Sequence, residues 1–142
     1  MDQVVTDKVL VSVLMPTYNS AKYLADAIQS IIDQSYTHWE LIICDDGSTD
    51  NSITIIESFK DSRIRVLVND INKGLVYTRN LLIAAATGKY IAMLDSDDIA
   101  LPNRLAVQVY FLESHPHFGL LGAWVQPIDA DGHAKQHIYR YT

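Results

Sequence analysis

Apolar residues alternate along the chain between short continuous runs and stretches with helical spacing. The continuous runs predict strands at residues 9–15, 39–44, 64–68, 90–94 and 118–125. Apolar residues three or four positions apart predict helices between these strands, near residues 24–32, 53–59, 75–86 and 105–112. This strand–helix order predicts an α/β fold, with a mostly parallel sheet covered by helices on both faces.

Local residues mark the expected ends of these elements. Pro16 is expected to end the first strand. Asn19 or Ser20 is expected to cap the first helix, and Ser48, Thr49 or Asp50 the second. Gly88 is expected to end the third helix in a left-handed conformation, and His115-Pro116 to end the fourth. Residues 128–133 are expected to form a turn. We therefore expect one domain over residues 1–142, with a core at about 9–126 and an extended piece at 127–142.

Composition narrows the class of protein. The chain has 142 residues, 49% of them hydrophobic and 20% charged, which is typical of one globular domain. A net charge of −6 without a Lys/Arg run argues against nucleic acid as a partner. Cys44, the single cysteine, lies in an apolar run and is expected to be a buried, inert thiol.

Hydropathy gives an expectation for location. The sequence has no run of 18 apolar residues and no basic-then-apolar start of the kind that signal peptides have. We expect a cytoplasmic protein, with any membrane association supplied by a segment outside this chain.

Two clusters of aspartates follow predicted strands. Asp45 and Asp46 follow the second strand, and Asp95, Asp97 and Asp98 follow the fourth. Because ligands of parallel sheets bind at the carboxyl ends of the strands, both clusters are expected at one edge. Three acids in four positions repel one another unless a cation joins them, and Mg²⁺ or Mn²⁺ takes one or two carboxylates together with phosphate oxygens. A helix macrodipole is the alternative, and it explains one acid but not three.

Three further features have open alternatives. Tyr18 could stack on a flat ring to which Thr17 hydrogen-bonds, or it could pack under the sheet edge. The Asp45-Asp46 pair could accept from a ligand, or Asp-Gly-Ser could be only a turn. Arg79 could reach phosphate oxygens, or it could pair with a carboxylate on the surface.

Taken in order, these motifs resemble the family 2 glycosyltransferases, which have the Rossmann-like GT-A fold. The matching text covers residues 11–19 (VSVLMPTYN), 40–50 (ELIICDDGSTD), 72–74 (NKG), 78–80 (TRN), 86–90 (ATGKY), 94–98 (LDSDD) and 101–105 (LPNRL). A single DXD motif would be weak support, but this ordered series over residues 9–112 is specific.

The resemblance implies an enzyme of polysaccharide biosynthesis. It would transfer a sugar with inversion from a nucleoside diphosphate sugar, often a UDP-sugar, to a carbohydrate or lipid-linked acceptor, with Mg²⁺ or Mn²⁺ bound. Carried over by position, the resemblance implies a base pocket lined by Pro16, Thr17 and Tyr18, with Asp46 in contact with the base and Arg79 near the base and the phosphates. It also implies that Asp95 contacts the ribose or the metal and that Asp97 is the main metal contact, with Asp98 beside it.

One part of the family pattern is not found. The catalytic base of the family, usually an Asp, comes from a later segment, and neither Asp129 nor Asp131 beside the Gly132 turn is assigned that role. We expect the chain to be the donor-binding portion of a longer enzyme, with self-association covering an exposed apolar face.

Two rival functions remain open from the sequence. A sugar-phosphate nucleotidyltransferase would want a glycine-rich basic loop after the first strand, but residues 15–23 contain no glycine and one lysine, Lys22. The other rival is a non-catalytic nucleotide-binding or regulatory module.

Overall fold

The computed structural model describes residues 9–135 of the chain. The chain divides into two compact units, with the boundary between Tyr110 and Phe111, and each unit is described by itself. The single domain expected over residues 1–142 stays a prediction. The last part of its extended piece, residues 136–142, lies outside the described residues, as do residues 1–8.

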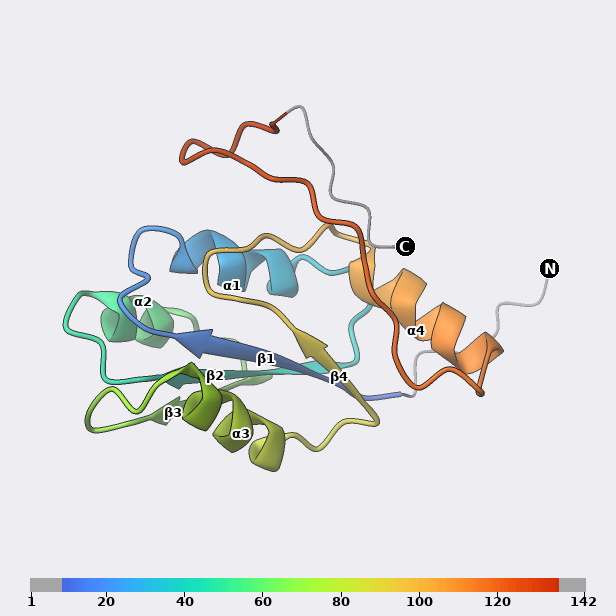
Figure 1. Cartoon of the computed structure of the whole chain (residues 1–142), viewed down its shortest axis with the longest axis horizontal. Helices are drawn as coiled ribbons and strands as arrows, with labels where there is room; N and C mark the ends of the chain where they lie inside the picture. The colour runs from blue at the N-terminus through green and yellow to red at the C-terminus, as the bar shows by residue number, and fades with distance from the viewer. Residues whose placement is uncertain (1–8, 136–142) are drawn as a thin grey trace. The chain divides into compact units, whose positions relative to one another are not determined.

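The first unit alternates strands and helices along the chain (Figure 1). The elements are β1 (Val11–Thr17), α1 (Leu24–Ile32), β2 (Trp39–Asp45), α2 (Ser52–Ser58), β3 (Ile64–Val68), α3 (Leu75–Ala85), β4 (Tyr90–Met93) and α4 (Arg104–Ser114), the last of which runs across the unit boundary. The four strands lie in the order β3-β2-β1-β4, and all neighbours are parallel. The predicted parallel α/β fold is confirmed.

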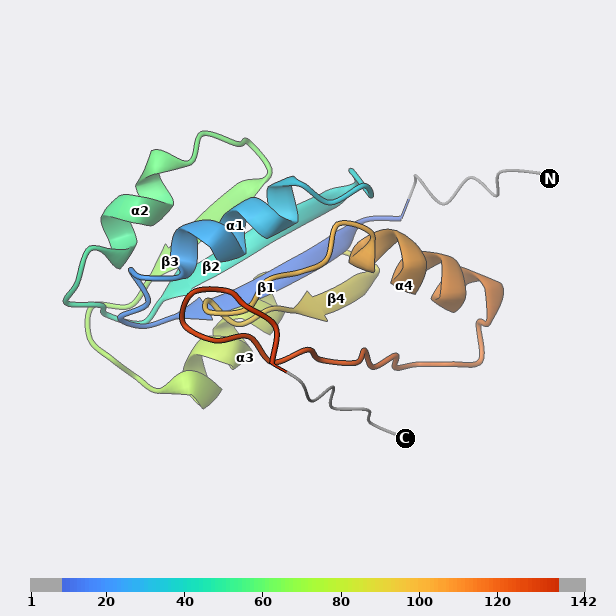
Figure 2. The same ribbon diagram turned by 90° about the horizontal axis from the view of Figure 1, so that it is seen from above.

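Alternation along the central strands builds two apolar layers. Val13 and Met15 of β1 pack on the face that α1 and α2 cover, in a cluster that includes Ile28. Leu14 points to the opposite face and packs with Leu82 of α3. Figure 2 shows α1 and α2 together on one side of the sheet and α3 on the other. Helices therefore cover both faces, as predicted.

Pro16 does not end β1, which continues to Thr17. The prediction was wrong because proline lacks a donor on one side of the strand only. On the β4 side, pairing ends where Leu94 N–H donates to the Leu14 carbonyl oxygen (3.1 Å), since the next bond would need an N–H from Pro16. On the β2 side the ladder goes on, and Asp46 N–H donates to the Thr17 carbonyl oxygen (2.8 Å). Pro16 thus separates β1 from β4 at this edge.

The predicted helix caps were also wrong. Helix α1 begins at Leu24 after Tyr23, and α2 begins at Ser52 after Asn51; neither preceding residue makes a side-chain cap. Of the proposed caps, Asp50 comes nearest, because its Oδ1 accepts the Ser52 N–H (2.9 Å). The other polar side chains tie loops to one another instead, and for this reason they are not available to the helices.

Gly88 is not the left-handed terminator of α3, because the positive-φ glycines among the described residues are Gly47, Gly74 and Gly132. The helix ends at Ala85, followed by extended backbone at Ala86. Gly88 is required for space: a Cβ there would lie 2.6 Å from the Ser12 nitrogen and 2.7 Å from the Leu10 carbonyl oxygen. Close backbone approach, not backbone conformation, accounts for this glycine.

The strand predicted at residues 118–125 is not formed, since residues 118–124 belong to no strand. Gly119 and Gly122 interrupt the apolar run, and glycine weakens strands. Leu120 and Trp124 remain 86% and 64% exposed, so the run builds no apolar face within its unit. The predicted turn at residues 128–133 is present and is closed by an antiparallel bridge between Ile128 and Ala134. No helix within residues 9–135 is long and apolar enough to cross a bilayer.

Glu40, at the amino end of β2, is the centre of a buried polar network. Its carboxylate accepts hydrogen bonds from the Ser12 hydroxyl (2.6 Å), from the N–H and hydroxyl of Thr87 (2.9 and 2.7 Å) and from the Arg65 guanidinium (3.1 Å). Burial by itself raises the pKa of Glu40, but these donors outweigh it and lower the pKa from 4.5 to about 2. The network joins β1, β2, β3 and the α3–β4 loop at the edge opposite the aspartates.

The low pKa of Glu40 predicts a stability that depends on pH. A carboxylate with a depressed folded pKa stabilises fully above its unfolded value, so the contribution is present above pH 4.5 and is lost as the pH falls toward 2. The shift corresponds to about 3 kcal/mol. Urea unfolding of the wild type and of Glu40→Gln at pH 7 and pH 3 measures it. The wild type should lose more free energy of unfolding between these pH values than Glu40→Gln, and equal losses would contradict the assignment.

Candidate functional site

A cleft of about 280 Å³ opens at the carboxyl ends of the strands. Its lining comes from residues 16–18 of the β1 end, Asp46 after β2, Leu75 and Thr78 of α3, and residues 95–97 after β4. The site lies where the strand order reverses, because β1 has β2 on one side and β4 on the other. Open α/β sheets bind ligands at this point.

The structure brings most of the predicted site residues together. Six of them line the cleft: Pro16, Thr17, Tyr18, Asp46, Asp95 and Asp97. Arg79 and Asp98 do not line it, although Arg79 contacts a residue that does. Since Asp46 and Asp97 share one cleft, the two acid clusters do meet at one edge of the sheet.

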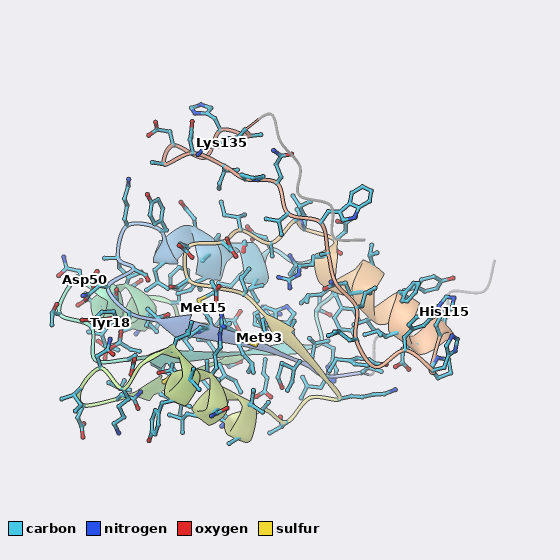
Figure 3. The ribbon with its side chains drawn as sticks, viewed as in Figure 1. Met15, Tyr18, Asp50, Met93, His115 and Lys135 are labelled. Atoms are coloured by element: carbon cyan, nitrogen blue, oxygen red, sulfur yellow. The ribbon has the colours of Figure 1, made fainter. Side chains whose placement is uncertain are left out.

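The loop that presents Tyr18 is held by polar contacts to its neighbours. Asn19, with φ 48°, donates its N–H to the Ser48 hydroxyl (2.9 Å), and its side-chain oxygen accepts the Thr49 N–H (2.8 Å). The Ser20 and Ser96 hydroxyls are hydrogen-bonded at 2.7 Å, which ties this loop to the acidic loop. Tyr18 itself is 47% exposed, so it is not packed under the sheet edge (Figure 3).

The sequence left open whether Asp45 and Asp46 form a turn or accept hydrogen bonds from a ligand, and the two residues differ in this respect. Asp45 makes the turn, since its Oδ2 accepts the Ser48 N–H (3.1 Å) and Gly47 follows with φ 71°. Asp46 faces the cleft and accepts three hydrogen bonds, from the Asn69 side-chain amide (2.7 Å) and from the N–H groups of Lys73 and Gly74 (both 2.9 Å). Burial opposes ionisation of Asp46, but these donors hold the pKa of its carboxyl below the ordinary value.

Two buried oxygens near the cleft lack hydrogen-bond partners among the described residues. They are the Thr17 hydroxyl and Asp45 Oδ1, on residues that pair in the β1–β2 register. Buried polar atoms are seldom left unsatisfied in proteins. Because Thr17 lines the cleft, its hydroxyl is available to a bound ligand.

Arg79 pairs with a carboxylate, which is the plainer of the two alternatives that the sequence allowed. Its guanidinium donates to Asp95 Oδ1 at 2.9 Å, and the two side chains are 39% and 48% exposed. The pair is too exposed to stabilise the fold by much. It does fix the direction of Asp95 at the cleft and places a cation beside the acidic loop.

The acidic loop has a donor set suited to a hard divalent cation. Asp97 is exposed, and its carboxylate accepts no hydrogen bond from residues 9–135; Asp95 keeps its Oδ2 outside the pair with Arg79. Asp95, Asp97 and Asp98 do not form a trio with ligand atoms all within 4.8 Å in the described part of the chain. This arrangement fits Mg²⁺ or Mn²⁺ held by one or two carboxylates and completed by phosphate oxygens.

Asp98 differs from the other two acids of this loop. Desolvation, and then the negative charges of Asp97 and Asp95, raises the pKa of Asp98, while the nearby Arg104 opposes the rise. Arg104 donates to the Met93 carbonyl oxygen (2.9 Å) at the end of β4. Asp98 thus lies near Arg104 and outside the cleft lining, whereas Asp95 and Asp97 line the cleft.

Sequence reasoning missed several residues at this site. Ser20, Asn72, Leu75, Thr78 and Ser96 also line the cleft, and Asn69 supports Asp46 from beneath. Asn72, Thr78 and Ser96 stand in matched motifs, which was a usable signal. The others gave none, since their roles depend on loops that meet only in the folded chain.

Comparison with known proteins assigns the family. A family model described as "Glycosyl transferase family 2" matches residues 12–141. The chain belongs to glycosyl transferase family 2. The family resemblance of the motifs is thereby confirmed, and so is the GT-A type of fold.

Relatives of this family 2 chain are enzymes by name. It is 44% identical over 103 residues to the UDP-Glc:alpha-D-GlcNAc-diphosphoundecaprenol beta-1,3-glucosyltransferase WfgD of Escherichia coli, covering 72% of this chain and 41% of WfgD. The chain therefore spans less than half the length of that relative.

Solved structures agree with the family 2 assignment. The crystal structure of S. aureus TarS 1-349 in complex with UDP-GlcNAc matches with a TM-score of 0.72 and 30% identity, over 75% of this chain and 32% of TarS. The mannosyltransferase PcManGT of Pyrobaculum calidifontis, solved with GDP-Man and Mn²⁺, matches with a TM-score of 0.65 and 27% identity, over 72% of this chain and 32% of PcManGT.

Proposed function

We propose that this chain is the donor-binding portion of a metal-dependent, inverting glycosyltransferase of polysaccharide biosynthesis that uses a UDP-linked sugar. The observation that carries the proposal is the single cleft shared by Tyr18, Asp46, Asp95 and Asp97. The exposed ring of Tyr18 and the buried carboxylate of Asp46 are suited to a nucleotide base, and the acidic loop is suited to a metal-bound diphosphate.

The hydrogen bonds of Asp46 favour uracil over guanine. A carboxylate has about four acceptor positions, and three N–H donors already occupy Asp46. At most one position remains for a ligand. Uracil offers one ring N–H between two carbonyl groups, whereas guanine offers a ring N–H beside an amino group and needs two acceptors. The site therefore suits a uridine nucleotide.

The metal and the phosphates belong at the acidic loop. Asp97, with Asp95 beside it, would hold Mg²⁺ or Mn²⁺, and the bound ion would neutralise the charge of the departing diphosphate. Arg79 holds Asp95 in place and lies close enough to add positive charge near the phosphates. Ser96 fixes the loop through its bond to Ser20.

The acceptor is proposed from a relative. The name of WfgD gives UDP-Glc as donor and a diphosphoundecaprenol-linked sugar as acceptor, which supports a lipid-linked or other carbohydrate acceptor here. Inversion requires a base that deprotonates the acceptor hydroxyl in line with the leaving group. We assign that base to no residue of the described range.

Titration calorimetry with UDP, GDP and CDP in the presence of Mn²⁺ tests the proposed donor. UDP should bind at least about tenfold more tightly than GDP or CDP, because either competitor leaves a donor or acceptor of the base without a partner. Equal affinity for GDP would reject the uridine assignment. No binding of any of the three would reject the donor site and favour a non-catalytic module.

A further inference from the structure

We propose that Asn69 is a positioning residue for the donor base, and that its buried side-chain amide directs the Asp46 carboxylate toward the cleft and keeps it ionised. This inference rests on the proposed function, because it takes Asp46 as the group that meets the base. Asn69 lies directly after β3 and does not line the cleft. It would therefore act on the ligand indirectly, chiefly through Asp46.

Asn69 is anchored by both its backbone and its side chain. It is 5% exposed, and its N–H donates to the Asp45 carbonyl oxygen (2.8 Å), which continues the pairing of β3 with β2. Its amide nitrogen donates to Asp46 Oδ1 at 2.7 Å and lies 3.5 Å from the Thr78 hydroxyl. A side chain held this way has one orientation, and it transfers that orientation to Asp46.

Neutral donors alone hold the charge of Asp46. The carboxylate is 3% exposed, and no Lys or Arg within residues 9–135 makes an ion pair with it. Two of its three hydrogen bonds come from backbone N–H groups, which no substitution of a side chain removes. The Asn69 amide and the Thr78 hydroxyl are the side-chain donors that lower the pKa of Asp46. Asn69 makes the short contact of the two, at 2.7 Å, so it is the first place to tune the carboxylate.

Several titratable groups lie around Asp46. Asp45 and Cys44 precede it on β2, and burial raises the pKa of the Cys44 thiol to about 11, as expected for an inert cysteine. Lys73 lies in the loop over Asp46, with its ammonium nitrogen 4.9 Å from the centre of the Tyr77 ring. Asp95 faces the same cleft from beyond β4. These groups are the same in the wild type and in the Asn69 variants, so comparison at each pH isolates the effect of residue 69.

Two substitutions should give opposite pH profiles. Asn69→Leu removes the donor and keeps the size, so UDP should bind about tenfold more weakly at pH 8. The loss should grow as the pH falls, because removal of a donor raises the pKa of Asp46. Asn69→Asp puts a second carboxyl at hydrogen-bond distance. The two carboxyls can share a proton more readily as the pH falls, whereas at pH 8 two charges repel and UDP affinity should fall by about tenfold or more.

The test is UDP calorimetry with Mn²⁺ on the whole chain from pH 5 to pH 8. Each affinity is divided by that of the wild type at the same pH, which cancels the titration of UDP itself. Asn51→Leu, a change of an exposed asparagine before α2, is the matched control and should follow the wild type. If both Asn69 variants bind UDP as the wild type does, or lose affinity equally at all pH values, the inference is wrong. If the wild type binds no UDP, the proposed function fails instead.

Discussion

Asp97→Ala is expected to remove the Mn²⁺-dependent part of UDP binding. Asp97 is the exposed acid of the cleft whose carboxylate is not engaged by other described residues, so its loss removes a metal ligand and no core contact. A bound divalent ion contributes several kcal/mol to holding a diphosphate, and we expect UDP to bind about 100-fold more weakly in saturating Mn²⁺. Calorimetry at fixed Mn²⁺ measures the change.

The control for Asp97→Ala is Asp26→Ala, which removes an exposed aspartate in the first turn of α1. It alters the net charge equally but should leave UDP affinity within about twofold, since surface charges at a distance are screened. Circular dichroism should show both variants folded. Unchanged UDP affinity in a folded Asp97→Ala chain would contradict the metal assignment.

Gly47→Ala should damage both the fold and the cleft. Gly47 has φ 71°, and a Cβ there would lie 2.6 Å from the carbonyl carbon of Ile71 and 2.7 Å from the nitrogen of Asn72. Backbone cannot give way as a flexible side chain can, so we expect a loss of about 3 kcal/mol or more in the free energy of unfolding. The loop that must move carries the N–H groups of Lys73 and Gly74, so UDP binding should weaken as well.

Gly74→Ala separates the two causes of that loss. Gly74 also has a positive φ, 87°, but a Cβ there meets nothing within 4 Å. This variant should therefore lose only the conformational part, about 1–3 kcal/mol in urea unfolding, because φ 87° with ψ 157° is a region that glycine alone adopts readily. If Gly47→Ala is no more destabilised than Gly74→Ala, the close approach of Gly47 to the 71–72 backbone is not a constraint on the fold.

The parallel sheet could be predicted because its signal is local. Each of β1 to β4 is a mainly apolar run that is followed by a polar break. The central strands β1 and β2 are buried along their whole length, whereas the edge strand β3 is largely exposed. The failed strand at residues 118–125 shows the limit. Its residues have the same apolar character, but a strand also needs a neighbour to pair with, and the sequence does not say whether one is present.

The candidate site was partly predictable for a related reason. Residues that follow strands in a parallel sheet must gather at one edge, so the order of the strands along the chain was enough to place Tyr18, Asp46 and Asp97 together. Asn69 could not be found, because its role depends on a 2.7 Å contact between the ends of two different strands. The polar residues Asn19 and Asp50 were wrongly predicted as helix caps. The side-chain oxygens that can cap a helix can equally accept hydrogen bonds from the backbone of a neighbouring loop.

The most direct test is the affinity of the whole chain for UDP in Mn²⁺ and in EDTA. If aspartates at one rim hold a divalent ion against a diphosphate, UDP should bind in Mn²⁺ and weaken by about 100-fold or more when the ion is removed. The same affinity in EDTA as in Mn²⁺, or no binding in either, would contradict the account.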